Sequence, residues 1–372
     1  MKIVTAIDSM KGSLTSKQAN QIVAEVFRDE KLEVTEVAIA DGGEGTVEAF
    51  VTNANGEVIS VKCHNLLGDE ITADYGWLKE EKTAVIESAA TCGIQFLKGT
   101  SGTHPHNTNS YGLGEQILSA AQKGAKRIII GLGGTGTIDG GIGLLACLGV
   151  EFFDKQNQLV SPIPRNFKKI TRVETPKMPM MLKELEIIVA ADVKSTITGE
   201  KGAVYLFGEQ KGLQSNELAA FEEEMTHYSK LLLEGAESQE GDGAAGGIGL
   251  ALRTILQAKV VSGLDLIAEQ SHLPEIIQQA DLVITGEGKI DSQSLQGKVP
   301  VGIGAMAQKH QVPVLVFVGA MQGESDEFEK AGLSVIIPIV NEVSTLTEAL
   351  MYAEQNLRQA AERTKKLLFL LT

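Results

Sequence analysis

Short apolar runs alternate along this chain with longer segments in which apolar residues recur every three or four positions. The run from Lys2 to Ile7 is typical of a buried strand, and the apolar positions between Ala19 and Phe27 would form one face of a helix. Thr15 and Gln18 have the spacing of a capping box, which predicts that this helix begins after Thr15. The alternation of such strands and helices predicts an α/β fold.

The same patterns predict further elements. Strands are expected at residues 34–40, 127–130, 185–190, 282–285, 312–318 and 335–339. Helices are expected at residues 46–53, 111–123, 142–148, 218–234, 245–257, 301–310 and 345–368.

The two ends of the chain have cleaner β-α units than its middle. We therefore predict one Rossmann-like domain, a doubly wound and mostly parallel sheet built from residues 1–65 and 265–372. Residues 66–264 have longer loops and would form a second, inserted α/β domain. We expect the active site to lie in the cleft between the two domains.

Composition and charge narrow the possible partners. The formal net charge of −15 argues against nucleic acid and against anionic membranes, which would both be repelled. Three scattered cysteines predict reduced thiols and a cytoplasmic protein. The start of the chain does not resemble a signal peptide, and no apolar run is long enough to span a membrane. The apolar end at residues 366–372 could pack on the body or on a second copy, so a homodimer stays open.

One segment, residues 281–300, combines glycine, lysine and acid in a way that suits a nucleotide. We expect its strand to break into a loop at Gly286 and Gly288, where a ligand could approach the backbone. Lys289 and Lys298 would meet phosphate, and Asp291 would need a cation such as Mg²⁺ between itself and phosphate. The segment therefore predicts a site for a metal-bound nucleotide and favours phosphoryl transfer.

Three further polar segments follow predicted strands. Asp8 and Lys11 follow the first strand, Asp41 follows the second, and Asp192 follows the strand at 185–190. Ligands of open α/β sheets bind beyond the carboxyl ends of the strands, so these segments are candidates for one site. Each could instead be a capped turn with no chemical role.

The glycine-rich stretch at residues 131–141 permits two interpretations. Its G-x-G-x-x-G pattern would suit a dinucleotide, which makes a nicotinamide-dependent oxidoreductase an alternative. The added hydroxyls and charge suit phosphates with Mg²⁺ better. The cofactor-binding candidates here are Gly133, Gly134, Thr135, Thr137 and Asp139.

Taken in order, these segments resemble the bacterial glycerate kinase family of the first type. Asp8–Leu14 is similar to its D-S-F-K-G-S-L, residues 40–46 to its A-D-G-G-E-G-T, and residues 281–300 to its D-L-V-I-T-G-E-G-R-x-D-x-Q-[ST]-x-x-G-K-x-P. The match spans nearly the whole chain. The resemblance implies an ATP-dependent kinase that phosphorylates D-glycerate, at the 2-hydroxyl, with Mg²⁺.

Within this resemblance we expect particular residues to carry the chemistry. Asp8, Lys11, Asp41, Asp192 and Asp291 are the catalytic candidates. Asp192 and Asp291 would provide the Mg²⁺ ligand and the acceptor of the hydroxyl proton, in an order that the sequence leaves open. Lys11 would stabilise either the transferring phosphoryl group or the substrate carboxylate.

Three loops depart from the family pattern. Gly136 stands for an alanine and Ile138 for an asparagine, residues 194–197 lack an Asn-Pro pair, and residues 103–106 replace R-N-P-L. These differences leave the exact hydroxy acid open. They also leave open a second alternative, in which the protein is a non-catalytic relative that senses an organic acid.

Overall fold

The computed structural model describes residues 1–98, 103–191, 195–292 and 294–371. Two compact units are present. Unit 1 contains Met1–Asp41, Glu48–Asn55 and Leu264–Thr372, and unit 2 contains Gly42–Val47 and Gly56–Gly263. The mixed α/β fold class is confirmed, with sheets whose strand pairs are mostly parallel. Among the described residues no helix is both long and apolar enough to cross a membrane.

Unit 1 is built on a five-stranded sheet that joins both ends of the chain. Its strand order is β13-β12-β11-β1-β2, and all four pairs are parallel. The strands are β1 (Lys2–Ile7), β2 (Glu33–Glu36), β11 (Leu282–Ile290), β12 (Val314–Met321) and β13 (Val335–Pro338). The helices are α1 (Ser16–Phe27), α2 (Thr46–Asn53), α10 (Gly263–Gln270), α11 (Leu273–Gln278), α12 (Val299–Gln308), α13 (Ser325–Lys330), α14 (Leu346–Met351) and α15 (Ala353–Leu371), with a 3-10 turn, η5 (Ser294–Gln296).

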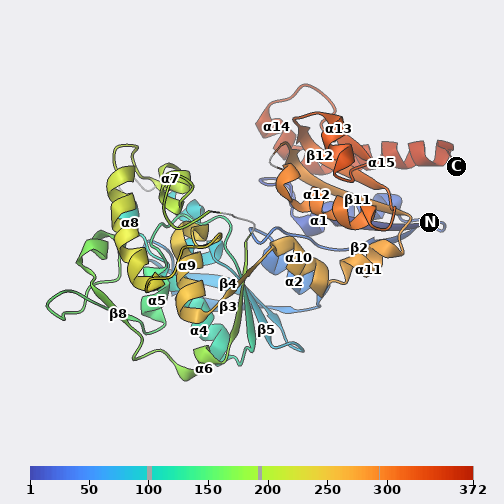
Figure 1. Ribbon diagram of the computed structural model, residues 1–372. Coiled ribbons are helices and arrows are strands. Elements are labelled where there is room, and N and C mark those ends of the chain that lie inside the picture. The colour runs from blue at the N-terminus through green and yellow to red at the C-terminus, as the bar shows by residue number, and fades with distance from the viewer. Residues whose placement is uncertain (99–102, 192–194, 293, 372) are drawn as a thin grey trace. The chain divides into compact units, whose positions relative to one another are not determined.

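Helices of unit 1 pack against its sheet as the apolar pattern requires (Figure 1). The capping box predicted at the start of α1 is present, because Thr15 accepts from the backbone of Gln18 and the Gln18 side chain accepts from Thr15. Ile22 and Phe27 of α1 share one core with Leu357 of α15. Helix α12 packs separately on β11 and β12.

Unit 2 is built on a six-stranded sheet in the order β10-β9-β6-β5-β4-β3. Its strands are β3 (Glu57–His64), β4 (Glu70–Leu78), β5 (Thr83–Glu87), β6 (Arg127–Gly131), β9 (Glu186–Ala190) and β10 (Lys259–Val261), with a separate hairpin of β7 (Glu151–Phe153) and β8 (Arg172–Glu174). Its helices are α3 (Ala89–Cys92), α4 (Tyr111–Gln122), α5 (Ile142–Cys147), α6 (Met180–Lys183), α7 (Ala203–Phe207), α8 (Leu218–Leu233) and α9 (Ala244–Leu256), and its 3-10 turns are η1 (Ile94–Leu97), η2 (Pro105–Asn107), η3 (Pro164–Lys169) and η4 (Glu209–Lys211).

Several predicted elements differ from the structure, among them the strand expected at residues 34–40, which ends at Glu36. The strand expected to end at residue 285 continues to Ile290, because β12 extends alongside it and pairs Lys289 with Ala320. The glycines serve this pairing, since a Cβ on Gly286 would lie 2.2 Å from the Phe317 carbonyl oxygen. The single helix expected at 345–368 is two helices, α14 and α15, which meet at Tyr352.

Candidate active site

A cavity of about 660 Å³ lies in unit 1 at the carboxyl ends of its central strands. Residues that follow or end β1, β11 and β12 line it, and the loop after β13 and helix α14 complete it. Strands β1 and β11 are neighbours, and from them the chain order runs outward in opposite directions. This switch point is where open α/β sheets bind ligands.

The backbone holds Asp8 at the end of β1. The Asp8 N–H donates to the Gly286 carbonyl at 3.0 Å. The buried amide of Asn20, on α1, accepts from the Ile7 N–H at 3.0 Å and donates to the Ile7 carbonyl at 3.1 Å. Asn20 therefore positions Asp8, and its signal in the sequence is a polar residue on the largely apolar face of α1, which also carries the buried Ser16.

The ionisation of Asp8 is strongly disfavoured. Its side chain is 8% exposed, and burial, reinforced by the nearby carboxylate of Asp41, raises the pKa of Asp8 to about 8. Lys11 lowers the pKa of Asp8 and Glu287 raises it, both by smaller amounts than burial does. A carboxyl group with a pKa near neutrality is well suited to accept and release a proton during catalysis.

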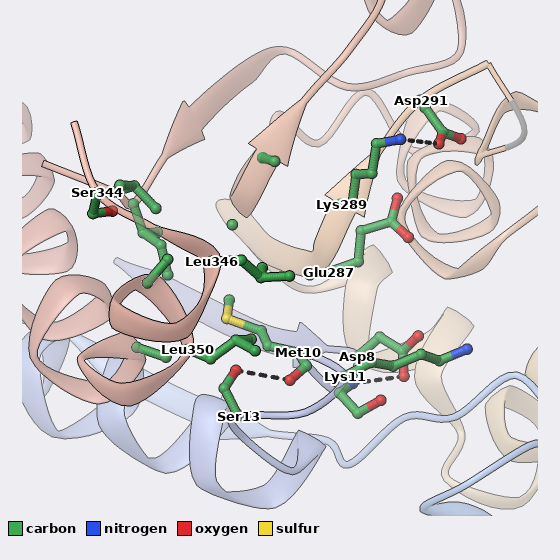
Figure 2. A pocket seen from close by; sticks show the side chains of 18 of the residues that line it. Asp8, Met10, Lys11, Ser13, Glu287, Lys289, Asp291, Ser344, Leu346 and Leu350 are labelled. Atoms are coloured by element: carbon green, nitrogen blue, oxygen red, sulfur yellow. Dashed lines mark hydrogen bonds and ion pairs between the residues drawn. The ribbon is translucent and has the colours of Figure 1, made fainter. Parts of the chain in front are cut away.

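A second carboxylate, Glu287, lies on β11 beside this cavity (Figure 2). Burial raises its pKa, while the Ser294 hydroxyl, which donates to it at 2.7 Å, lowers that pKa. The Ser294 hydroxyl also accepts from the Asp291 N–H, so it ties Glu287 to the turn after β11. The sequence does not single out Glu287 as a site residue, because its burial depends on the fold.

Cations line the same cavity. Lys11 Nζ lies 4.0 Å from Asp41 Oδ2, and Lys289 Nζ lies 3.1 Å from Asp291 Oδ2. Lys298 stands at the start of α12, where backbone N–H groups and the helix dipole favour an anion. Charges of both signs are therefore gathered at one end of the cavity.

Most of the site residues that the sequence predicts in unit 1 line the cavity. Asp8, Lys11, Asp41, Gly288, Lys289, Asp291 and Lys298 all line it. Gly286 lies beneath them in the sheet, where it allows β12 to approach. Asp192 falls outside the described residues.

The glycine-rich loop after β6 lies in unit 2 and has a different character. Asp139 is fully buried, and it accepts hydrogen bonds from the Ser110 N–H and hydroxyl, both at 2.7 Å, and from the N–H groups of Gly141 and Gly143. Burial raises the pKa of Asp139, whereas these hydrogen bonds lower it. The carboxylate is thus placed to hold the loop in shape.

Lys211 completes the buried network of this loop. Its ammonium donates to Thr135 Oγ1 at 3.2 Å and to the Thr137 carbonyl at 3.0 Å. Burial lowers the pKa of Lys211 to about 8, and Asp139 counteracts that effect. The sequence gives Lys211 no role, because its burial depends on the packing of the folded chain. Gly133 is half-buried and Gly134 is exposed.

The departures from the family pattern have structural explanations where they are described. A Cβ on Gly136 would lie 2.9 Å from the Cα of Ile94, so η1 approaches too closely for alanine. Ile138 is fully buried in the core of unit 2. Both changes therefore affect packing. Residues 192–194 lie outside the described part of the chain.

The third altered loop is tied to helix α8 and its N-cap by hydrogen bonds between histidine and glutamate. His104 lies 3.0 Å from Glu217, and His106 lies 2.8 Å from Glu224. The two imidazole rings stack with their centroids 4.8 Å apart. Residues 103–106 stand where the family usually has R-N-P-L, and their two histidines contact Glu217 and Glu224.

The expected magnesium site can be compared with these side chains. In the described residues, no group of three or more His, Cys, Asp and Glu side chains could hold a metal ion. Mg²⁺ usually keeps several waters and binds through one or two carboxylates plus substrate phosphates. The repulsion between the Asp8 and Asp41 carboxylates, which raises the pKa of Asp8, fits such a cation arriving with a nucleotide.

Several proteins similar to this chain carry the name glycerate kinase or glycerate 2-kinase. A family model described as the glycerate kinase family matches residues 3–369. The glycerate kinase of Bacillus cereus is 34% identical over 97% of this chain and 96% of its own length, as is the glycerate 2-kinase of Escherichia coli K12. A crystal structure from Salmonella typhimurium LT2, provisionally assigned as glycerate kinase 2, has a TM-score of 0.87 at 33% identity and covers 99% of this chain and 98% of that one. The oxidoreductase and sensor alternatives are not favoured, and the chain belongs to the glycerate kinase family.

Proposed function

We propose that this glycerate kinase transfers the γ-phosphoryl group of ATP to the 2-hydroxyl of D-glycerate. The observation that carries the proposal is the charged end of the unit 1 cavity, where a buried Asp8 with a pKa of about 8 lies among Lys11, Lys289 and Lys298. The name of the Escherichia coli relative, glycerate 2-kinase, supports the choice of hydroxyl.

In this reaction Asp8 accepts the proton of the attacking hydroxyl group. The glycerate 2-oxygen forms a bond to the γ-phosphorus while the bond from that phosphorus to the β,γ-bridging oxygen breaks. The electron pair of the broken bond stays on that oxygen, which leaves as part of ADP. Positioning and charge stabilisation supply most of the catalysis of such transfers.

The lysines have separate roles in the proposal. Lys11 stabilises the transferring phosphoryl group or the glycerate carboxylate. Lys289, with Gly288 beside it, and Lys298, at the start of α12, bind the ATP phosphates. In unit 2, Gly133 and Gly134 are the part of the glycine-rich loop that we propose as a further phosphate contact, and Thr135, Thr137 and Asp139 hold that loop.

Mg²⁺ would be held by Asp291 or Asp41, with Asp192 as a further proposed ligand. When bound, Mg²⁺ neutralises charge on the phosphate oxygens. This assignment leaves Asp8 to accept the proton, which differs from our expectation that Asp192 or Asp291 would do so. Its basis is the burial of Asp8 and the resulting rise in its pKa.

Phosphorus NMR of the product tests the proposed reaction directly. The protein is incubated with ATP, Mg²⁺ and D-glycerate, and we expect a phosphate signal split by the single proton on carbon 2. A signal split by the two protons on carbon 3 would contradict the choice of hydroxyl, and no glycerate-dependent ADP would contradict the reaction. Lys11→Met and Asp291→Asn should each lower turnover by a factor of ~10² or more.

A further inference from the structure

The unit 1 cavity has two ends of different chemistry (Figure 2). Asp8, Glu287 and Lys289 mark the charged end, which the ends of β1 and β11 provide. Leu346 and Leu350 mark the apolar end, which helix α14 and the loop before it provide. The cavity therefore suits a ligand that is charged at one end and apolar at the other.

The apolar end leaves large side chains uncovered. Leu346 is 75% exposed and Val343 is fully exposed, although both line the cavity. Met10 and Ile339 also line the cavity and are each only 2% exposed. Together with Leu346 and Val343 they form an apolar wall of the cavity. Uncovered apolar side chains next to converging polar groups are typical of a ligand site.

This wall is held in place before any ligand binds. Thr345 begins α14 with a full capping box, in which its hydroxyl accepts from the Glu348 N–H and its own N–H donates to the Glu348 carboxylate. Leu350, one turn further along α14, lies against the loop after β1, because the methyl groups of Leu350 are 3.8 Å from the Cβ position of Gly12. The apolar wall and the Asp8 loop are therefore parts of one packed surface.

Glycerate cannot fill both ends of this cavity. Each of its carbons carries oxygen, so it offers no apolar face to Leu346 or Val343. A volume of about 660 Å³ also suits a ligand of nucleotide size. A nucleoside triphosphate has the required chemistry, since a flat base stands at one end and a chain of anions at the other.

We propose that the apolar end is the nucleobase subsite of this kinase, where Leu346, Leu350 and Met10 contact the adenine ring of ATP. The triphosphate then extends toward Lys289 and Lys298 at the charged end. The inference rests on the proposed function in taking ATP as the phosphoryl donor. It adds that Leu346 and Leu350 determine affinity for the base and take no part in phosphoryl transfer.

The test compares Leu346→Gln with Met351→Gln. Met351 lies on the same short helix and is 69% exposed, but it does not line the cavity. Calorimetry measures the binding of ADP and of inorganic tripolyphosphate, which has no base. We expect Leu346→Gln to weaken ADP roughly tenfold and to leave tripolyphosphate unchanged, whereas Met351→Gln changes neither.

Kinetics separates this inference from the proposed function. Leu346→Gln should raise the KM for ATP roughly tenfold, with kcat and the KM for glycerate within about twofold of wild type. Unchanged ADP affinity in both Leu346→Gln and Leu350→Gln would overturn the inference even if glycerate is phosphorylated. Leu346-dependent ADP binding without glycerate turnover would support the subsite and overturn the proposed reaction.

Discussion

A buried carboxylate after β1 in unit 1 and one in the glycine-rich loop of unit 2 have different surroundings. In unit 1, Asp8 is buried near the carboxylates of Asp41 and Glu287, which add to the rise in its pKa. In unit 2, Asp139 accepts four hydrogen bonds from Ser110, Gly141 and Gly143. Both carboxylates are buried in segments that follow a strand, yet Asp8 has carboxylate neighbours that oppose its charge, whereas Asp139 has hydrogen-bond donors that stabilise its charge. Poorly compensated charge is typical of catalytic sites, and satisfied charge is typical of structural ones.

The largest expected effect comes from removing the Asp8 carboxylate. Asp8→Asn should lower kcat by about 10²–10⁴, the usual contribution of a positioned general base. The folded-state pKa of about 8 exceeds the ordinary 3.8, so stability falls as pH rises between these values, and the variant should be more stable at pH 8 by on the order of 1–2 kcal/mol. Steady-state kinetics and urea unfolding measure the two effects. A variant with wild-type kcat would place Asp8 outside the chemistry.

For Asp139 we expect a loss of stability on substitution, whereas substitution of Asp8 should raise stability. Asp139→Ala leaves the buried Lys211 without its nearby charge and frees the Ser110 and Gly143 donors, so we expect a loss of about 3–5 kcal/mol in unfolding free energy. Urea unfolding at one pH measures this loss. A destabilisation below about 1 kcal/mol would mean that Asp139 does not hold the loop and that the contrast with Asp8 fails.

Lys211 allows the two units to be compared by the pH dependence of the unfolding free energy. Its folded-state pKa of about 8 lies below the ordinary 10.5, so its ionisation makes stability rise as pH increases between these values. Lys211→Met should remove that rise, and at pH 7 the loss of the donor to Thr135 and Thr137 should offset part of the stability gained by removing the buried charge. Urea unfolding of both proteins from pH 7 to about pH 10 tests this, and an unchanged slope would contradict it.

Gly136 offers the smallest test. Gly136→Ala restores the residue usual in the family but places a Cβ 2.9 Å from the Ile94 Cα, so we expect a loss of about 1 kcal/mol in unfolding free energy. Gly134→Ala is a useful comparison, because the Cβ at that exposed position would have only Ala89 within contact, at 3.3 Å, but would be strained by its φ of +74°. Equal stability of Gly136→Ala and wild type would show that η1 moves away from the added Cβ at little cost in free energy.

Local signals in the sequence predicted much of this fold. The capping box at Thr15 and Gln18 and the strand before Asp8 needed only neighbouring residues, and both are present. The extension of β11 past Gly286 was not predictable, because it depends on pairing with β12, a strand about 30 residues further along.

The candidate site shows the same limit. Strand ends indicated Asp8, Lys11 and Asp291, since parallel strands bring their carboxyl ends to one edge. Hydrogen bonds distinguish Asp139 from Asp8, which is also buried, and the bonds from Ser110 arise from the packing of distant segments. The sequence did not indicate the apolar wall at Leu346 either, because the spacing of apolar residues along α14 is that of any amphipathic helix.

The pH dependence of kcat/KM tests the central claim, that Asp8 ionises near neutrality and accepts the substrate proton. For the wild type we expect kcat/KM to rise about tenfold per pH unit and to level off near the Asp8 pKa of about 8. Asp8→Asn should give a low rate without this ionisation. A flat wild-type profile between about pH 6 and pH 9, or the same rise in Asp8→Asn, would contradict the account.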